Sequence, residues 1–168
     1  MRALVVPHQQ WRGFSFHVIL SYVARYKGLK GKYWTLFSEY VRRRDFIQFG
    51  NCVSCGNPVS DWRQFDAGHF ISAGGGGFAL LFDERNVNGE CKYDNAFNGV
   101  HLLLYRRGLD VRYGPGTADA LEERYRDSHF RGKTTKEWSK KEYETKIIEI
   151  KAKLAAFHLE SQITRILA

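Results

Sequence analysis

The chain has 168 residues, enough for one domain with a substantial core, and its 43% hydrophobic and 15% aromatic content excludes a largely disordered protein. Its net charge of +8 favours a polyanionic partner, for which nucleic acid is the usual example. Three cysteines are too few for a framework of disulfides, and no run approaches the roughly 20 apolar residues of a membrane span, so we expect a protein of a reducing compartment with no membrane partner.

The basic charge is concentrated ahead of the first cysteine. Residues 1–48 contain nine lysines and arginines against two acidic residues, which leaves +7 of the total charge in this region. Interleaved aromatic residues favour a DNA-contacting face over a merely solubilising surface. The pattern predicts a helix over 14–26, a linker at 28–31 and a helix over 32–45. The last turn of that second helix carries Arg42, Arg43 and Arg44, where cations suit the helix dipole.

The middle of the chain predicts two strands and a helix. Residues 65–72 alternate enough for a strand, and the four consecutive glycines at 74–77 are typical of a hairpin loop. The apolar run at 78–82 fits the returning strand, and a helix is expected from Lys92 to about Arg107. Two strands followed by one helix form a ββα arrangement.

The C-terminal part predicts two more helices. Thr117 is expected to cap the first, which ends near residues 129–133, and Thr134 or Thr135 is expected to cap the last, where Thr134–Glu137 and Ser139–Glu142 both resemble capping boxes. Apolar residues in the last helix recur at spacings of four and three: Tyr143, Ile147, Ile150, Leu154 and Phe157. Such a seam packs either on its own domain or against a second copy of the chain.

A zinc site is indicated by the cysteines. Structural zinc takes four tetrahedral ligands, usually in two close pairs. Cys52 and Cys55 make one pair, and Cys91 begins a second in which Asp94 occupies the partner position. Carboxylate ligates zinc, so three cysteines and one aspartate are a possible ligand set; His101 is the alternative fourth ligand, and an incomplete site is a further alternative.

A second constellation lies between the two halves of this knuckle. Asp66 and His69 are three residues apart, and Asn95 follows the second half of the knuckle. Hydrolysis of a phosphodiester needs a base, for which neutral imidazole is suited near pH 7, and a divalent metal. Carboxylate and amide oxygens suit magnesium, so Asp66 and Asn95 are the candidate ligands, with Asn98 a lesser alternative as a metal or phosphate contact.

The order of these motifs resembles the NinG (Rap) family of lambda-like phage recombination proteins, a branch of the HNH, or ββα-metal, nucleases. The matching segments span about residues 33 to 125 and are Tyr33–Asp45, Cys52–Gly56, Asp66–Ser72, Phe82–Val87 and Tyr113–Gly116. The resemblance implies an α+β fold: a ββα-metal (HNH-like) core with a zinc knuckle at 49–112, a basic helical region at 1–48 before it and a helical region at 113–168 after it.

The resemblance also implies an activity. The implied activity is that of an endonuclease that cuts branched recombination intermediates, such as Holliday junctions and D-loops. It would use structural Zn²⁺ and catalytic Mg²⁺ or Mn²⁺, and its products would have 5′-phosphate and 3′-hydroxyl ends. By position, His69 is similar to the general base and Asp66 and Asn95 to the metal ligands. Asn86 is similar to the middle Asn of the HNH pattern, which fixes the histidine-bearing loop. Asp94 departs from the family pattern, which has cysteine there.

Several partners follow from the same resemblance. Symmetrical cutting of a junction needs two active sites, so a homodimer is expected, and phage or host recombinase and single-strand-binding proteins are further possible partners in the host cytoplasm. Basic residues near the core are candidate DNA contacts together with the three arginines above: Arg85, Lys92, Arg106 and Arg107. Two other readings stay open, namely a branched-DNA-binding protein that does not cut and a site-specific nicking or homing-type nuclease.

Overall fold

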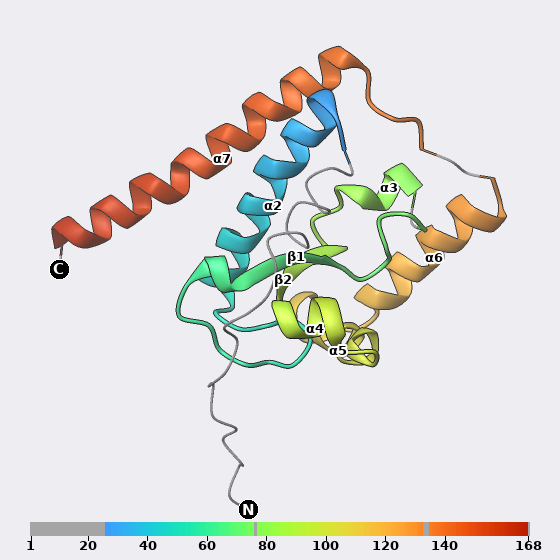
Figure 1. Cartoon of the computed structure of the whole chain (residues 1–168), viewed down its shortest axis with the longest axis horizontal. Helices are drawn as coiled ribbons and strands as arrows, with labels where there is room; N and C mark the ends of the chain where they lie inside the picture. Colours follow the sequence, from blue (N-terminus) through green and yellow to red (C-terminus); the bar gives the residue numbers. More distant parts are fainter. Residues whose placement is uncertain (1–25, 76, 133–134, 168) are drawn as a thin grey trace, which may run out of the picture.

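The computed structural model describes residues 26–75, 77–132 and 135–167, with side chains as far as residue 157. This part of the chain has an α+β fold in which helices surround a two-stranded antiparallel sheet (Figure 1). Its elements are helix α2 (Gly28–Gln48), the 3-10 turn η1 (Trp62–Gln64), strand β1 (Phe65–His69), helix α3 (Gly77–Leu81), strand β2 (Val87–Cys91), and helices α4 (Lys92–Phe97), α5 (His101–Tyr113), α6 (Thr117–Phe130) and α7 (Lys140–Leu167).

The helix expected over 14–26 lies outside the described residues, apart from its last residue.

None of the helices in the described ranges combines the length and the apolarity that a transmembrane span requires.

The sheet separates two groups of side chains. The register sets Asp66 opposite Glu90 and His69 opposite Val87. Successive side chains of a strand point to opposite faces. Ala67 and Val87 therefore join the cluster that packs on α2, whereas Asp66 and Glu90 contact residues of α4 and α5. The candidate residues thus reach both faces of one narrow sheet.

The strand that pairs with β1 is not the one that the sequence indicated. The apolar run 78–82 lies largely in helix α3, and the returning strand is β2. A short apolar run does not distinguish a strand from a buried helical turn, and its alanine and leucines are strong helix formers. Strand β2 gives no apolar signal because Asn88 and Glu90 are polar, although both are fully buried.

Other boundaries also differ. Residues 28–31, expected to be a linker, form the first turn of α2, where Leu29 packs on the core and Lys30 pairs with Glu137 at 3.1 Å. The helix expected from Lys92 is interrupted after Phe97 and continues as α5. The sequence overlooked this break, in which Gly99 is a weak helix former.

The first C-terminal helix begins with a different cap from the one expected, whereas the last begins at the second of the two expected capping boxes. Gly116 is the N-cap of α6, and the Thr117 hydroxyl donates to the carbonyl of Gly114 at 2.8 Å. At the start of α7 the Ser139 amide donates to the Glu142 carboxylate at 2.7 Å, and the Glu142 amide donates to the Ser139 hydroxyl at 3.3 Å. The last helix therefore begins with a capping box at Ser139. Of the expected caps, Thr135 precedes the helix and Thr134 lies outside the described residues.

The core has two parts. One packs α2 against α7 and β2 and consists of Tyr33, Phe37, Tyr40, Val41, Val87, Tyr143, Ile147, Ile150 and Leu154. The other lies where α3, α5 and α6 meet and consists of Val53, Phe70, Leu80, Tyr105, Leu109, Ala118 and Leu121. The apolar seam of the last helix is therefore used within the chain. Figure 1 shows α7 lying along α2, so these two apolar faces cover each other.

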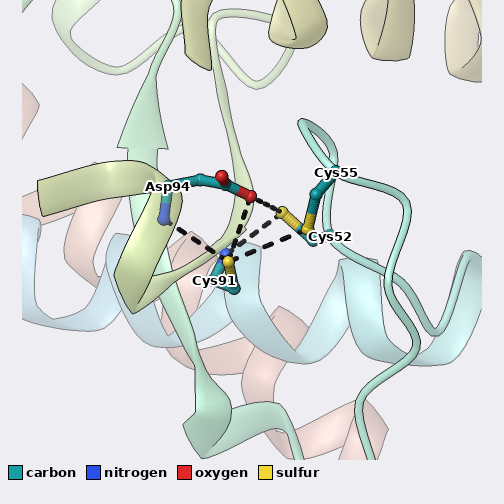
Figure 2. Close-up of side chains that lie close together, drawn as sticks. All are labelled: Cys52, Cys55, Cys91 and Asp94. Carbon is teal, nitrogen blue, oxygen red and sulfur yellow. Dashed lines mark hydrogen bonds between the residues drawn. The ribbon is translucent and has the colours of Figure 1, made fainter. Parts of the chain in front are cut away.

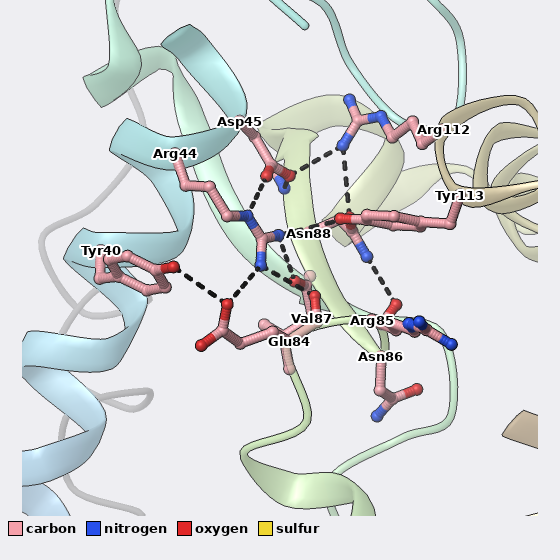
Figure 3. A network of polar contacts seen from close by, with 12 residues as sticks. Tyr40, Arg44, Asp45, Glu84, Arg85, Asn86, Val87, Asn88, Arg112 and Tyr113 are labelled. Carbon is pink, nitrogen blue, oxygen red and sulfur yellow. Dashed lines mark hydrogen bonds and ion pairs between the residues drawn. The ribbon is translucent and has the colours of Figure 1, made fainter. Parts of the chain in front are cut away.

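A buried carboxylate joins α2, β2 and α5 (Figure 3). Asp45 has no exposed surface and accepts hydrogen bonds from the guanidinium groups of Arg44 at 2.6 Å and Arg112 at 2.8 Å. Its other contact is the amide of Gly89, which donates at 2.5 Å. A Cβ at Gly89 would lie 3.1 Å from the Cβ of Asp45 and 2.8 Å from the ring of Phe65, so only glycine allows this approach.

This network makes a prediction about stability. Asp45→Ala should lower the free energy of unfolding by about 3–5 kcal/mol, because it leaves two buried guanidinium groups without their counter-charge. Urea denaturation followed by circular dichroism measures the change. The matched control is Glu39→Ala, which removes the half-exposed ion pair with Arg43 on the same helix and should cost less than about 1 kcal/mol. Equal losses in the two variants would contradict the role of Asp45.

Candidate functional site

Three thiols and one carboxylate converge where β2 meets α4 (Figure 2). The ligand atoms of Cys52, Cys55, Cys91 and Asp94 all lie within 4.8 Å of one another. The carboxylate oxygen Oδ2 of Asp94 is 3.1 Å from the sulfur of Cys91 and 3.3 Å from that of Cys52. A tight turn brings the first two cysteines together, since the amide of Gly56 donates to the carbonyl of Cys52 at 3.0 Å.

This donor set could hold a metal such as zinc. Three thiolates and one carboxylate match the ligand types and number of a tetrahedral zinc site. Asp94 is therefore the fourth member of the cluster that the spacing predicted. His101, the alternative, instead contacts Glu90 at 2.9 Å. Asn98 also has a place here rather than at the other constellation, because its amide donates to Oδ1 of Asp94 at 2.8 Å.

The thiols differ in their readiness to lose a proton. A hydrogen bond from the Cys91 thiol lowers the pKa of Cys52 to about 7, and the backbone amide of Cys91 adds to this effect. The pKa of Cys91 is raised, chiefly by that same hydrogen bond to Cys52. Burial opposes ionisation of Asp94, but hydrogen bonds from Cys55 and its neighbours hold its pKa below the ordinary value. Metal binding to this cluster would therefore displace protons from the remaining thiols.

A hollow of about 400 Å³ lies at the end of β1, and we call it the β1 hollow. Its lining residues are Tyr26, Trp34, Ala67, His69, Phe70, Ile71, Ser72, Ala73, Gly75, Asn95, His101, Leu102 and Tyr125. The structure thus brings His69 and Asn95 to one hollow. Asp66 does not line it, since its three-residue separation from His69 puts the two side chains on opposite faces of the strand. Asp66 is connected through Asn95, whose amide nitrogen donates to it at 3.2 Å.

The imidazole of His69 is held in a defined state. Its Nε2 lies 3.0 Å from the carbonyl oxygen of Leu81. A carbonyl only accepts hydrogen bonds, so Nε2 carries the proton and Nδ1 keeps its lone pair in the neutral ring. The indole of Trp34 stacks on the ring with centroids 5.2 Å apart and planes inclined by 19°. Helix α2 therefore contributes directly to the orientation of this histidine.

Asn86 holds the segment that follows His69. It has no exposed surface, and its side chain accepts from the amide of Ile71 at 2.8 Å and donates to the carbonyl of the same residue at 3.0 Å. It also donates to the carbonyl of Leu80 at 2.9 Å, while its own carbonyl accepts from the amide of Phe70. These bonds tie the end of β1 to α3, which carries the carbonyl that contacts His69.

The candidate DNA contacts fall into four groups. Arg44 is 6% exposed, and its guanidinium donates to the Asp45 carboxylate and to the backbone carbonyls of Glu84 and Val87, so it belongs to the core and not to a phosphate-contacting surface. Arg42 and Arg43 are half-buried and stack on Trp62 at 4.8 and 4.2 Å.

The remaining basic candidates differ in how far their charge is compensated. Arg106 is neutralised by Asp119 and Glu122. Arg85, Lys92 and Arg107 are exposed. These three are the better placed to meet a phosphate, because no buried network holds them.

The sequence analysis missed Glu90 and Asn88, which lie on the same face of β2. The strand assigned to residues 78–82 left Glu90 in a presumed loop, where an acidic residue carries no signal. Once β2 is recognised, period-two alternation sets Asn88 and Glu90 on one face, opposite Gly68 and Asp66. Recognition of a polar but buried strand was the signal that could have found them.

Sequence comparison connects the chain to a group of phage proteins. The family model described as "Bacteriophage Lambda NinG protein" matches residues 20–156. The chain is 32% identical over 116 residues to Protein ninG of Salmonella phage P22, which covers 68% of this chain and 53% of that protein. It is 33% identical over 88 residues to Protein ninG of Escherichia phage 933W, which covers 52% of this chain and 41% of that protein.

The matched region is only part of those relatives. The chain spans about half the length of the curated relatives it matches. No solved structure matches the chain significantly.

The thiol cluster predicts a metal content and a metal-dependent stability. We expect about one zinc per chain by elemental analysis, and a lower melting temperature after chelation, because the ion binds only the folded ligand set. Asp94→Cys should bind zinc more tightly than the natural chain, and Asp94→Ala more weakly, in a competition titration with a chromogenic chelator. A chelated protein as stable as the zinc-loaded one would exclude a structural zinc.

Proposed function

The chain belongs to the NinG family of bacteriophage proteins, and we propose that it is a metal-dependent endonuclease that cuts branched DNA such as Holliday junctions and D-loops. In this proposal β1, β2 and α4 form the ββα-metal core of an HNH-type nuclease, with structural zinc in the thiol cluster beside it. The observation that carries the proposal is the setting of His69. Its ring is fixed through Nε2, and it lines the same hollow as Asn95, which contacts Asp66.

His69 would act as the general base. Its Nδ1 accepts a proton from a water molecule, whose oxygen attacks the phosphorus of the scissile phosphodiester. The bond from phosphorus to the 3′ oxygen breaks, and that oxygen takes a proton from solvent, which leaves 5′-phosphate and 3′-hydroxyl ends. The contact of Nε2 with Leu81 keeps the ring in the required tautomer, and the stack on Trp34 keeps its orientation.

Asp66 and Asn95 would hold a catalytic magnesium or manganese ion. Such an ion, when bound, neutralises charge on the phosphate and on the departing oxygen. The residues fit the ion by donor type, because carboxylate and amide oxygens are the ligands that Mg²⁺ prefers. The amide nitrogen of Asn95 is the atom turned toward Asp66, so its oxygen is the atom left to coordinate.

The charge of the protein supports a DNA substrate. A chain of net charge +8 attracts a polyanion, and exposed cations lie on and beside the elements of the proposed core. A junction is resolved by paired cuts, so a homodimer is part of the proposal.

The activity is tested with a synthetic four-way junction. Purified protein should nick it in the presence of Mg²⁺ or Mn²⁺, and His69→Ala should bind the junction with unchanged affinity but cut it about 10²- to 10⁴-fold more slowly, since a general base contributes that much. Linear duplex of the same sequence is the control for branch selectivity.

Three outcomes would contradict this function in different ways. Binding without cutting by the natural chain in either metal would make it a branched-DNA-binding protein. Sequence-dependent cutting of linear duplex would make it a site-specific nuclease. Equal cutting by His69→Ala would remove the histidine from the chemistry.

Two neighbouring arginines on α5 allow a matched test of DNA binding. Arg107→Ala should weaken junction binding and lower the slope of log affinity against log salt by about 1, because one phosphate contact is lost. Arg106→Ala should leave the slope unchanged, because its guanidinium is paired with two carboxylates and makes no phosphate contact. Fluorescence anisotropy between low and moderate salt measures both variants. Identical behaviour of the two would remove this face of α5 from the DNA interface.

A further inference from the structure

Strand β2 carries a buried carboxylate with an unused oxygen. Glu90 has no exposed surface. Its Oε1 accepts hydrogen bonds from the hydroxyl of Ser54 at 2.5 Å and from Nδ1 of His101 at 2.9 Å. Its Oε2 has no hydrogen-bond partner, and no other buried side-chain nitrogen or oxygen in the described ranges is in that position. Such an atom is costly in a folded protein, so it points to a ligand that pairs with it.

The unused oxygen lies beside the residue that precedes His69. A Cβ at Gly68 would lie 2.4 Å from Oε2 of Glu90 and 3.2 Å from Oδ1 of Asn95. Both oxygens therefore border the small space that the missing side chain of Gly68 leaves. Asp66 sits directly opposite Glu90 in the sheet and contacts the amide nitrogen of Asn95 at 3.2 Å. The oxygens of Glu90 and Asn95 thus share one small space, and the Asp66 carboxylate is joined to it through the amide nitrogen of Asn95.

We propose that Glu90 is a ligand of the divalent cation of this site and completes a set of three oxygen donors with Asp66 and Asn95. The proposal rests on the proposed function for what the cation does, although binding of the cation does not require cutting. Two carboxylates and an amide oxygen form a hard donor set that suits Mg²⁺ or Mn²⁺, whereas the thiol cluster suits zinc. His101 is a positioning residue that holds Oε1 of Glu90 and leaves Oε2 to the cation.

The register of the two strands explains why the third ligand, the carboxylate of Glu90, comes from β2 and not from β1. A side chain at position 68 would occupy the space next to Asn95, but this position is glycine. Glu90 reaches the same space from the neighbouring strand, one step diagonal to Gly68 in the register. Glycine at 68 and glutamate at 90 are therefore two parts of one arrangement, and a methyl group at 68 would collide with the carboxylate.

The test is a Mn²⁺ titration followed by electron paramagnetic resonance. The full chain is first loaded with zinc, so that the thiol cluster does not take up manganese. The natural chain should bind one Mn²⁺, and Glu90→Gln, which keeps the shape but removes the charge, should lower the affinity about tenfold or more. Glu123→Gln is the matched control, because it makes the same change in an exposed carboxylate of α6 that pairs with Arg126 and Arg131, and it should leave the Mn²⁺ affinity unchanged. Glu90→Gln with natural Mn²⁺ affinity overturns the proposal.

A second measurement covers the case in which Glu90→Gln does not fold, which a thermal melt would reveal. Crystals of the natural chain soaked in MnCl₂ should give an anomalous peak within coordinating distance of Oε2 of Glu90. A peak held by Asp66 and Asn95 alone, with Glu90 outside coordinating distance, overturns the proposal.

Junction cleavage measured on the same preparations separates this inference from the proposed function. Mn²⁺ binding that depends on Glu90 without any cleavage supports the inference and rejects the nuclease. Cleavage together with Mn²⁺ binding that is indifferent to Glu90→Gln supports the nuclease and rejects the inference.

Discussion

The position of β2 depends on the buried carboxylate of Asp45. This carboxylate accepts hydrogen bonds from Arg44 of α2, from Arg112 of α5 and from the amide of Gly89 in the centre of the strand. Strand β2 has few apolar side chains with which to pack, so charge-assisted hydrogen bonds take the place of hydrophobic contact in fixing it. The candidate ligands on β2 and α4 depend on that placement, because Cys91 ends the strand and α4 begins directly after it.

The turn from β2 into α4 supplies both groups of candidate ligands. Glu90 and Cys91 are adjacent in a strand, so their side chains point to opposite faces. Asp94 and Asn95 are adjacent in a helix, where successive side chains are about 100° apart. One member of each pair joins the thiol cluster, and the other faces β1. The sulfur donors, together with the Asp94 carboxylate, thereby lie on one side of this short turn, and the oxygens of Glu90 and Asn95 lie on the other.

The sequence predicted those parts of the molecule in which spacing alone determines proximity. The Cys52 and Cys91 half-sites came together as expected, and Asp94 took the fourth position, because ligand pairs on tight turns leave few alternatives. The α+β class and residues 32–45 of helix α2 were also predicted correctly, and the family resemblance pointed to the NinG family to which the chain belongs. The second strand was not predicted, because hydrophobic patterning cannot identify a strand whose buried side chains are polar. Asp45 and Glu90 were missed for the same reason, since a buried charge is revealed only by its partners.

The neighbours of Asp94 are arranged to orient a carboxylate, so this position is more than one at which a cysteine has been lost. Asp94 is almost fully buried, a position that a carboxylate tolerates only when its oxygens are paired. The amide of Asn98 donates to Oδ1, which leaves Oδ2 facing the sulfurs of Cys52 and Cys91. Because Asn98 is also the residue at which α4 ends, the carboxylate is oriented by the same bend that begins α5 and brings His101 to Glu90. The thiol cluster and the β1 hollow are therefore connected through the bend between α4 and α5. A substitution at residue 94 that shifts this bend should alter the positions of side chains in both.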